Sequence, residues 1–253
     1  MASIKVRVGV FSPPKKFNPK KLVERLNSLQ SFYQFAYLGT SQNVGPSDVA
    51  KRHYSTNQLT RVFSSVYLPD ASYGYDLMLT DARIEGDYFT QIIGRLGIIS
   101  SADADLAIEK AGKSVEKYYA YNMIETLLWL QYDCEHDADR EDTGCLFDSC
   151  FETRSNIVLG LQRSTICDDC EHLLNAKNAP SEQIDSARSI LRWIARPSSA
   201  NYAKWGLSAG LLIAGLMLIV FPPVAAFQYV GIAMMTLSGW IASAPGSIWQ
   251  RRR

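Results

Sequence analysis

Histidine is scarce in this chain: among 253 residues only His53, His136 and His172 occur, far apart in the sequence. No two of them are three or four residues apart, so no helix presents two imidazoles on one face to a catalytic metal. The glycine-rich phosphate-binding motifs and the G-x-S-x-G motif of serine hydrolases are also missing from the sequence. These absences argue against histidine-dependent metallohydrolases, nucleotide-binding enzymes and serine hydrolases.

Charge is missing from one long segment. The 26 Lys and Arg residues nearly balance the 25 Asp and Glu residues, and the net charge of +1 argues against a nucleic-acid binder driven by bulk charge. No charged residue occurs from Trp205 to Gln250, and Arg251, Arg252 and Arg253 follow directly. The three arginines carry a charge of +3 and the whole chain carries +1, so residues 1–204 carry −2.

The uncharged segment predicts a transmembrane hairpin over residues 205–250. A bilayer requires roughly 20 apolar residues per helix, and Pro222-Pro223 divides the segment into two halves of about that length. Basic residues lie on both sides of the hairpin, so the positive-inside rule predicts cytoplasmic termini and a location in the bacterial inner membrane, with the lipid bilayer as partner. A buried pair of core helices is the alternative.

Small residues recur on the first half of this hairpin. Gly206 and Gly210 form a G-x-x-x-G pair, and Ala214 continues the same face. Small residues allow close helix approach, so we expect packing here and a homo-oligomer in the membrane.

Strand and helix patterns alternate in residues 1–204 and predict an α/β (α+β) cytosolic domain. Alternating apolar residues at 4–10 predict a strand with one buried face, and Asn18 is a candidate cap for a helix over 19–30. Further strands are expected at 33–38, 75–80 and 97–100, and further helices at 114–133 and 181–194. The expected domains are a zinc-containing domain at 1–178, an amphipathic linker helix at 181–204 and the hairpin at 205–250.

Four of the five cysteines follow a metal-ligand pattern. Cys145-x4-Cys150 and Cys167-x2-Cys170 are separated by sixteen residues, and two such pairs can present four thiolates tetrahedrally to a structural zinc ion. A redox role for the C-x2-C pair and a set of unrelated buried thiols are the alternatives; structural disulfides are not expected in a reducing cytoplasm. Cys134 is left over as an expected core residue.

The order of these features resembles the archaemetzincins. In that family a strand-rich N-terminal half precedes a long helix with the motif H-E-x-x-H-x-x-G-x-x-H, and a C-x4-C-x-M…C-x2-C structural zinc site follows. Here the helix expected at 114–133 precedes the two cysteine pairs, and the stretch 75–100 is similar to the family's sheet edge. The resemblance covers about residues 1–175 and implies a metzincin-like fold with a structural zinc.

Departures from the family motif determine what the resemblance implies about activity. When Glu125 is aligned with the catalytic glutamate, the three histidine positions fall at Ile124, Leu128 and Cys134. An isoleucine and a leucine in place of two imidazoles cannot bind a catalytic zinc. Two further positions differ, a glycine and a methionine that are replaced by Gln131 and Glu152. The resemblance therefore implies a pseudoenzyme with no catalytic residues.

A small cytosolic domain fused to a transmembrane hairpin resembles the membrane effectors of bacterial antiphage systems such as retrons. That resemblance implies a toxin that permeabilises the inner membrane and causes growth arrest or death when its sensor domain is triggered. The partners it implies are further copies of the chain and a regulatory protein or nucleic-acid-containing complex, such as a reverse transcriptase or nucleotidyltransferase system. A non-catalytic membrane-anchored adaptor and a membrane-tethered zinc metalloprotease are the alternatives.

A local basic cluster occurs near the N-terminus. Its members are Lys15, Lys16, Lys20, Lys21 and Arg25. The cluster predicts either a solvated helix face or a contact for a nucleic acid, a nucleotide or anionic headgroups.

Overall fold

The structure is a computed structural model of the chain. It describes residues 3–15, 17–41, 53–68, 70–86, 89–133, 143–148, 154–197, 206–214, 216 and 233–238. These residues divide between two compact units, 1–196 and 197–253, which are described separately.

A five-stranded sheet in the order β2-β1-β4-β7-β6 is the centre of the first unit, and β3 pairs with β5 in a small second sheet. β2, β1, β4 and β7 run parallel, whereas β6 is antiparallel to β7. The strands are β1 Ile4–Phe11, β2 Tyr33–Ser41, β3 His53–Tyr54, β4 Tyr75–Thr80, β5 Arg83–Ile84, β6 Thr90–Ile93 and β7 Leu96–Ser100. Parallel neighbours require crossover connections, so helices must cover the faces of this sheet.

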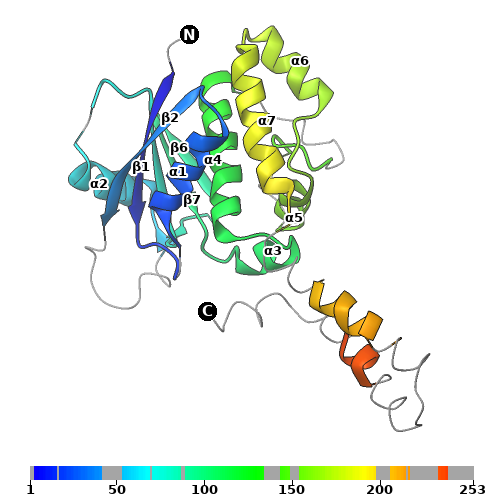
Figure 1. Ribbon diagram of the computed structural model, residues 1–253. Coiled ribbons are helices and arrows are strands. Elements are labelled where there is room, and N and C mark those ends of the chain that lie inside the picture. Colours follow the sequence, from blue (N-terminus) through cyan, green and yellow to red (C-terminus); the bar gives the residue numbers. More distant parts are fainter. Residues whose placement is uncertain are drawn as a thin grey trace, which may run out of the picture. The chain divides into compact units, whose positions relative to one another are not determined.

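Helices lie on both faces of the sheet (Figure 1). On one face, α1 and α4 pack against the sheet and α7 packs on α4; on the other face, α2 covers a second apolar cluster that includes Leu59, Phe63 and Met78. The helices are α1 Pro19–Leu29, α2 Thr56–Val66, α3 Asp105–Lys110, α4 Val115–Tyr132, α5 Arg154–Arg163, α6 Asp168–Ala176 and α7 Ser181–Ala195. The α/β part of the predicted fold is confirmed.

Both faces of β1 are buried, which corrects the prediction of a strand with one buried face. Val6, Val8 and Val10 lie in the core beneath α1 and α4, and Phe11 lies in the cluster beneath α2. Arg7 is only 5% exposed. β1 is a central strand with a helical layer on each side, so its polar side chains are also enclosed.

The outer edge of β2 is partly closed by side chains of the preceding helix and turn. Asn27 accepts a hydrogen bond from the Phe35 N–H at 2.9 Å and donates one to the Phe35 carbonyl at 2.8 Å. Gln30 makes the same pair of bonds with Tyr33, at 2.8 and 2.9 Å. These amides take the place of a neighbouring strand and satisfy backbone groups at the edge of the sheet.

Two short helices, 206–214 and 233–238, are described in the second unit. The two are joined by buried serines: the Ser208 hydroxyl donates to the Ser238 carbonyl at 3.0 Å, and the Ser238 hydroxyl donates to the Ser208 carbonyl at 2.7 Å. The remaining residues of the segment lie outside the described part of the chain.

The predicted transmembrane hairpin over 205–250 is wrong. Among the described residues, no helix combines the length and the apolarity needed to cross a bilayer. The predicted location in the inner membrane, with both termini cytoplasmic, depends on this hairpin and is wrong as well.

Candidate metal centre

Three of the four predicted zinc ligands lie together. The sulfur atoms of Cys145, Cys167 and Cys170 are all within 4.8 Å of one another, and this is the one cluster of metal-ligating side chains among the described residues. Cys145 and Cys170 are buried, and Cys167 is half-buried. The fourth predicted ligand, Cys150, lies outside the described residues, as does Cys134.

A tight turn positions Cys145. The Asp148 carboxylate accepts hydrogen bonds from the backbone N–H groups of Gly144 and Cys145, the latter at 3.0 Å. Gly144 has φ +77°, and a Cβ there would lie 2.7 Å from the Arg163 side chain, so the turn requires glycine. Neither Asp148 nor Gly144 is a metal ligand in the predicted pattern, and sequence reasoning missed their supporting role because local backbone bonding has no fixed spacing.

Backbone pairing and α4 hold the Cys145 turn against the second cysteine pair. Cys145 forms an isolated parallel bridge with Thr165, and the Leu146 N–H donates to the Thr165 carbonyl at 2.7 Å. The Tyr121 hydroxyl on α4 donates to the Cys145 carbonyl at 3.2 Å. The two cysteine segments are therefore fixed to each other and to the helix at the centre of the core.

The second pair sits at the beginning of α6. Cys167 is the N-cap of this helix and Cys170 lies in its first turn. The Cys167 N–H donates to the Cys145 sulfur at 3.3 Å. Free N–H groups and the positive end of the helix dipole favour negatively charged thiolates, which are the form that binds metal.

Hydrogen bonding links the thiols of this cluster. A hydrogen bond from Cys170 is the main cause that lowers the pKa of Cys145 to about 6, with further help from the N–H groups of Phe147 and Cys167. The same hydrogen bond, together with burial, raises the pKa of Cys170. One thiolate thus already forms next to two further sulfurs.

These residues fit zinc. In a tetrahedral site with zinc–sulfur bonds of about 2.3 Å, the thiolates lie roughly 3.8 Å apart. Three sulfurs within 4.8 Å can therefore bind one ion after small movements. Cys145, Cys167 and Cys170 would hold the ion, and it would join the Cys145 turn to α6. The cluster agrees with the predicted zinc cofactor, and the assignment of Cys145, Cys150, Cys167 and Cys170 as its ligands stays a prediction.

The α4 face that would carry a catalytic metal in the resembled family is part of the core. Ile124 and Leu128 are both 0% exposed and belong to the main apolar cluster. Glu125 between them is half-buried, and burial, followed by the negative charges of Cys145 and Asp148, raises its pKa to about 8. Glu125 therefore lies on the side of α4 that faces the cysteine turn.

The remaining residues singled out from the sequence do not gather. His53 is exposed on β3 and His172 is exposed on α6, while His136 lies outside the described residues. On helix 206–214, a Cβ added at Gly206 or Gly210 would meet no described atom within 4 Å. Ala214 is exposed. Close packing at these three small residues stays a prediction.

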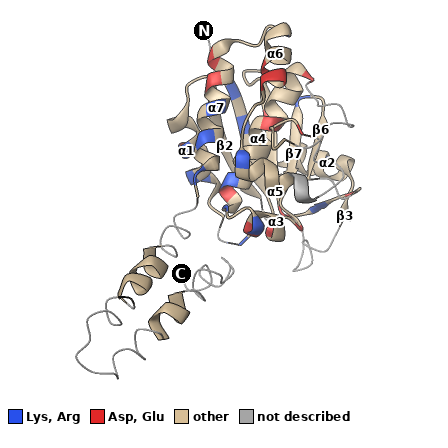
Figure 2. Cartoon of the chain, turned by 90° about the vertical axis from the view of Figure 1, so that its right-hand side faces the viewer, with Lys and Arg blue, Asp and Glu red and all other residues tan. Residues whose placement is uncertain are grey.

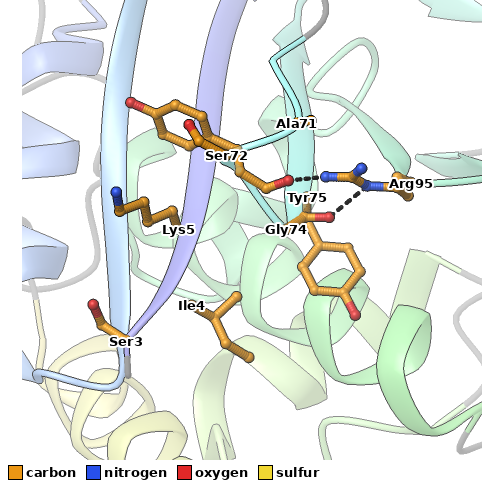
Figure 3. Close-up of a pocket in the computed structure, with 9 residues that line it drawn as sticks. Ser3, Ile4, Lys5, Ala71, Ser72, Gly74, Tyr75 and Arg95 are labelled. Atoms are coloured by element: carbon orange, nitrogen blue, oxygen red, sulfur yellow. Dashed lines mark hydrogen bonds between the residues drawn. The ribbon is translucent and has the colours of Figure 1, made fainter. Parts of the chain in front are cut away.

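An open pocket of about 520 Å³ lies at the amino-terminal end of the central strands (Figure 3). Arg95 forms one wall, where its guanidinium donates to the carbonyls of Tyr73 and Gly74, the latter at 2.7 Å. The lining residues are Ser3, Ile4, Lys5, Ala71, Ser72, Tyr73, Gly74, Tyr75 and Arg95. None of these lining residues is a carboxylate, an imidazole or a thiol.

Two solved structures are similar to this chain at low identity. No protein-family model and no curated protein matches the chain. A crystal structure of archaemetzincin from Methanopyrus kandleri is similar, with 17% identity, a TM-score of 0.46, and coverage of 70% of this chain and 97% of that one. Archaemetzincin from Archaeoglobus fulgidus, complexed with malonate, has 13% identity, a TM-score of 0.43, and coverage of 67% and 99%. Both similarities concern the fold alone.

Proposed function

We propose that residues 1–196 form a non-catalytic interaction domain, an adaptor, whose fold is stabilised by one structural zinc. The observation that carries this proposal is the complete burial of Ile124 and Leu128. Their side chains pack in the core where a catalytic site of the resembled family would need exposed imidazoles.

The environment of α4 supports this proposal along its length. Buried residues occur on every side of the helix from Lys117 to Leu128. A helix that is apolar and buried all round has a packing role, whereas an active-site helix leaves one face open to substrate. The predicted set of four cysteine ligands, three of which the structure describes, would also suit a structural role, because four filled positions leave none open for water or substrate.

Zinc content and peptidase activity of the full chain test the proposal together. We expect about one zinc per chain and no cleavage of a mixture of unstructured peptides. Zinc should be lost in Cys167→Ser and retained in Glu125→Gln. A second zinc in the wild type, with peptide cleavage that Glu125→Gln abolishes, would instead establish a metalloprotease.

A second candidate function is an effector that arrests growth in a retron-like antiphage system. The observation that favours it is the uncharged segment 205–250, which exposes Leu207, Leu212, Ile213, Leu216 and Leu237. Exposed apolar side chains in one unit favour burial against another molecule, here further copies of the chain. Induced expression tests this: growth arrest should require residues 197–253, and arrest by residues 1–196 alone would refute it.

A further inference from the structure

Cations from three helices converge on Trp193 near the end of α7. The guanidinium carbon of Arg25 on α1 lies 5.9 Å from the centre of the Trp193 ring, and the Lys117 Nζ on α4 lies 5.6 Å from it. Arg192 and Arg196 flank the tryptophan on α7 and are exposed. We call Lys21, Arg25, Arg192 and Arg196, together with Trp193, the Trp193 surface.

Two lysines beneath this surface fix its geometry. The Lys113 Nζ donates to the Ala195 carbonyl at 2.5 Å, and the Lys117 Nζ donates to the Ile194 carbonyl at 3.3 Å and to the Arg196 carbonyl. Both lysines are 6% exposed. They cap the last carbonyls of α7, where the helix dipole favours positive charge. They fix the backbone at the end of α7 and add to the positive field, but both are too buried to contact a partner.

The exposed cations of the surface are not neutralised within the described part of the chain. The ion pairs found there join Arg7 to Asp76, Arg83 to Asp103 and Arg188 to Glu171, and none involves the Trp193 surface. Lys21 and Arg25 lie one turn apart on α1, and Glu24 is the acidic residue on that exposed face. Asp185 is an exposed carboxylate on the Arg192 face of α7, and neither Glu24 nor Asp185 forms an ion pair with these cations among the described residues.

Charge is segregated across this unit although its net charge is slightly negative. Lys and Arg cluster on α1, whereas Asp and Glu are concentrated on α6, whose first turn contains Asp168, Asp169 and Glu171 (Figure 2). Such separation creates a local positive field that the net charge conceals. A partner with regularly spaced negative charges would gain from contacts with both α1 and α7.

We infer that the Trp193 surface binds the phosphate backbone of a nucleic acid without reading its sequence. Guanidinium groups suit phosphates, because their planar donors match two oxygens at once. Lys21 and Arg25 would contact phosphates from α1, and Arg192 and Arg196 would contact them from α7. The Trp193 ring has the cations of Arg25 and Lys117 next to it. Its role in this surface is to orient cations, and binding does not require it to stack on a base. This surface would give the proposed adaptor a partner, and in that sense the inference rests on the proposed function.

Fluorescence anisotropy with a labelled single-stranded RNA of mixed sequence tests the inference on the full chain. Neutralising about four phosphates predicts that log K falls with log salt with a slope of about −3. The double substitution Arg25→Glu and Arg192→Glu should weaken binding at least about tenfold and make this slope shallower. The milder double substitution Arg25→Gln and Arg192→Gln should weaken RNA binding less. It replaces the charge reversal as the test if the charge-reversed chain does not fold.

Arg61→Glu is the matched control, because Arg61 is exposed on α2 at the other face of the sheet. It should leave binding unchanged, whereas an equal loss in Arg61→Glu would overturn the inference. Absence of wild-type binding at low salt would also overturn it, as would tighter binding to poly-glutamate or to phosphatidylserine vesicles than to RNA. Zinc content is measured on each variant, so loss of the metal centre and loss of the nucleic-acid surface are distinguished.

Discussion

The charged guanidinium of Arg7 is buried in the middle of the central strand and has interaction partners on several sides. Its guanidinium pairs with the Asp76 carboxylate at 2.6 and 2.8 Å, donates to the Leu68 carbonyl and lies 5.8 Å from the centre of the Tyr73 ring. In the sequence Arg7 stands in an alternating strand pattern, which predicts exposure to solvent. The alternating pattern could not reveal that this side of the strand is covered too, because the covering segment, at Leu68, lies about sixty residues away in the sequence.

Removing Arg7 should be costly. Arg7→Met leaves the Asp76 carboxylate without its partner in a largely buried position, and we expect the free energy of unfolding to fall by about 3 kcal/mol. Arg83→Met is the matched control, because the Arg83–Asp103 pair is more than a third exposed on both sides and should contribute less than about 1 kcal/mol. Urea unfolding measures both. Equal losses in the two variants would contradict this account of Arg7.

Lys117 makes the free energy of unfolding depend on pH in the alkaline range. Burial, then the charges of Lys113 and Arg196, lowers its pKa from 10.5 to about 8, and Arg25 also faces it across Trp193. Because the folded-state pKa lies below the unfolded one, the charged form costs stability below pH 8, and this cost disappears between pH 8 and pH 10.5.

The wild type should therefore gain stability relative to Lys117→Met as pH rises through this window. The gain is at most about 3 kcal/mol, at about 1.4 kcal/mol per pKa unit. Urea unfolding at pH 7.5 and at pH 10.5 gives the difference, and Lys20→Met on the exposed face of α1 controls for loss of a lysine charge. A difference between wild type and Lys117→Met that is constant with pH would be evidence against the lowered pKa.

At the scale of elements, α4 shows what periodicity can and cannot establish. The pattern over 114–133 predicts a helix, and α4 Val115–Tyr132 confirms it. The helix is buried on more than its apolar side, since polar residues such as Asn122 and Thr126 are buried as well. α7, α5 and the sheet enclose the helix, and a sequence window does not contain these distant contacts.

A truncation in α4 tests its role as a core helix. Leu128→Ala should lower the free energy of unfolding by about 2–5 kcal/mol, as expected for a fully buried leucine. Leu130→Ala, at a half-buried position of the same helix, should cost clearly less. Both are measured by urea unfolding. A Leu128→Ala variant as stable as wild type would mean that this face borders an open site.

The elements missed from the sequence have weak local patterns. α2 Thr56–Val66 has a capping box at Ser55 and Gln58, yet its apolar face is short, and it was not predicted. β6 Thr90–Ile93 is a short edge strand whose side chains are all half-buried. In contrast, β1, β2, β4, β7, α1 and α7 were all predicted within a few residues, because buried strands and long amphipathic helices carry strong patterns.

At the scale of the whole molecule, the uncharged segment shows the difference between composition and structure. The lack of charge from Trp205 to Gln250 is a property of the sequence, but crossing a bilayer also requires one helix of sufficient length. Among the described residues no helix is long and apolar enough to do so, and the architecture inferred from composition alone is therefore wrong. Cysteine spacing was a better guide, because a metal needs a fixed number of ligands at fixed distances.

The cysteine cluster joins distant parts of the first unit. Cys145 contacts α4 through Tyr121, and Cys167 and Cys170 begin α6, which is tied to α7 by the Arg188–Glu171 pair. A zinc ion at this position would cross-link these segments, and its binding energy would become folding energy. The account therefore requires stability and metal content to change together.

The most direct test is the thermal unfolding midpoint of the full chain before and after metal removal with a chelator under reducing conditions. Chelation should lower the wild-type midpoint by at least about 5 °C. Cys167→Ser should begin at a lower midpoint and not respond to the chelator, and Glu125→Gln should respond as the wild type does. A wild-type midpoint that is the same with and without metal would contradict the structural zinc centre.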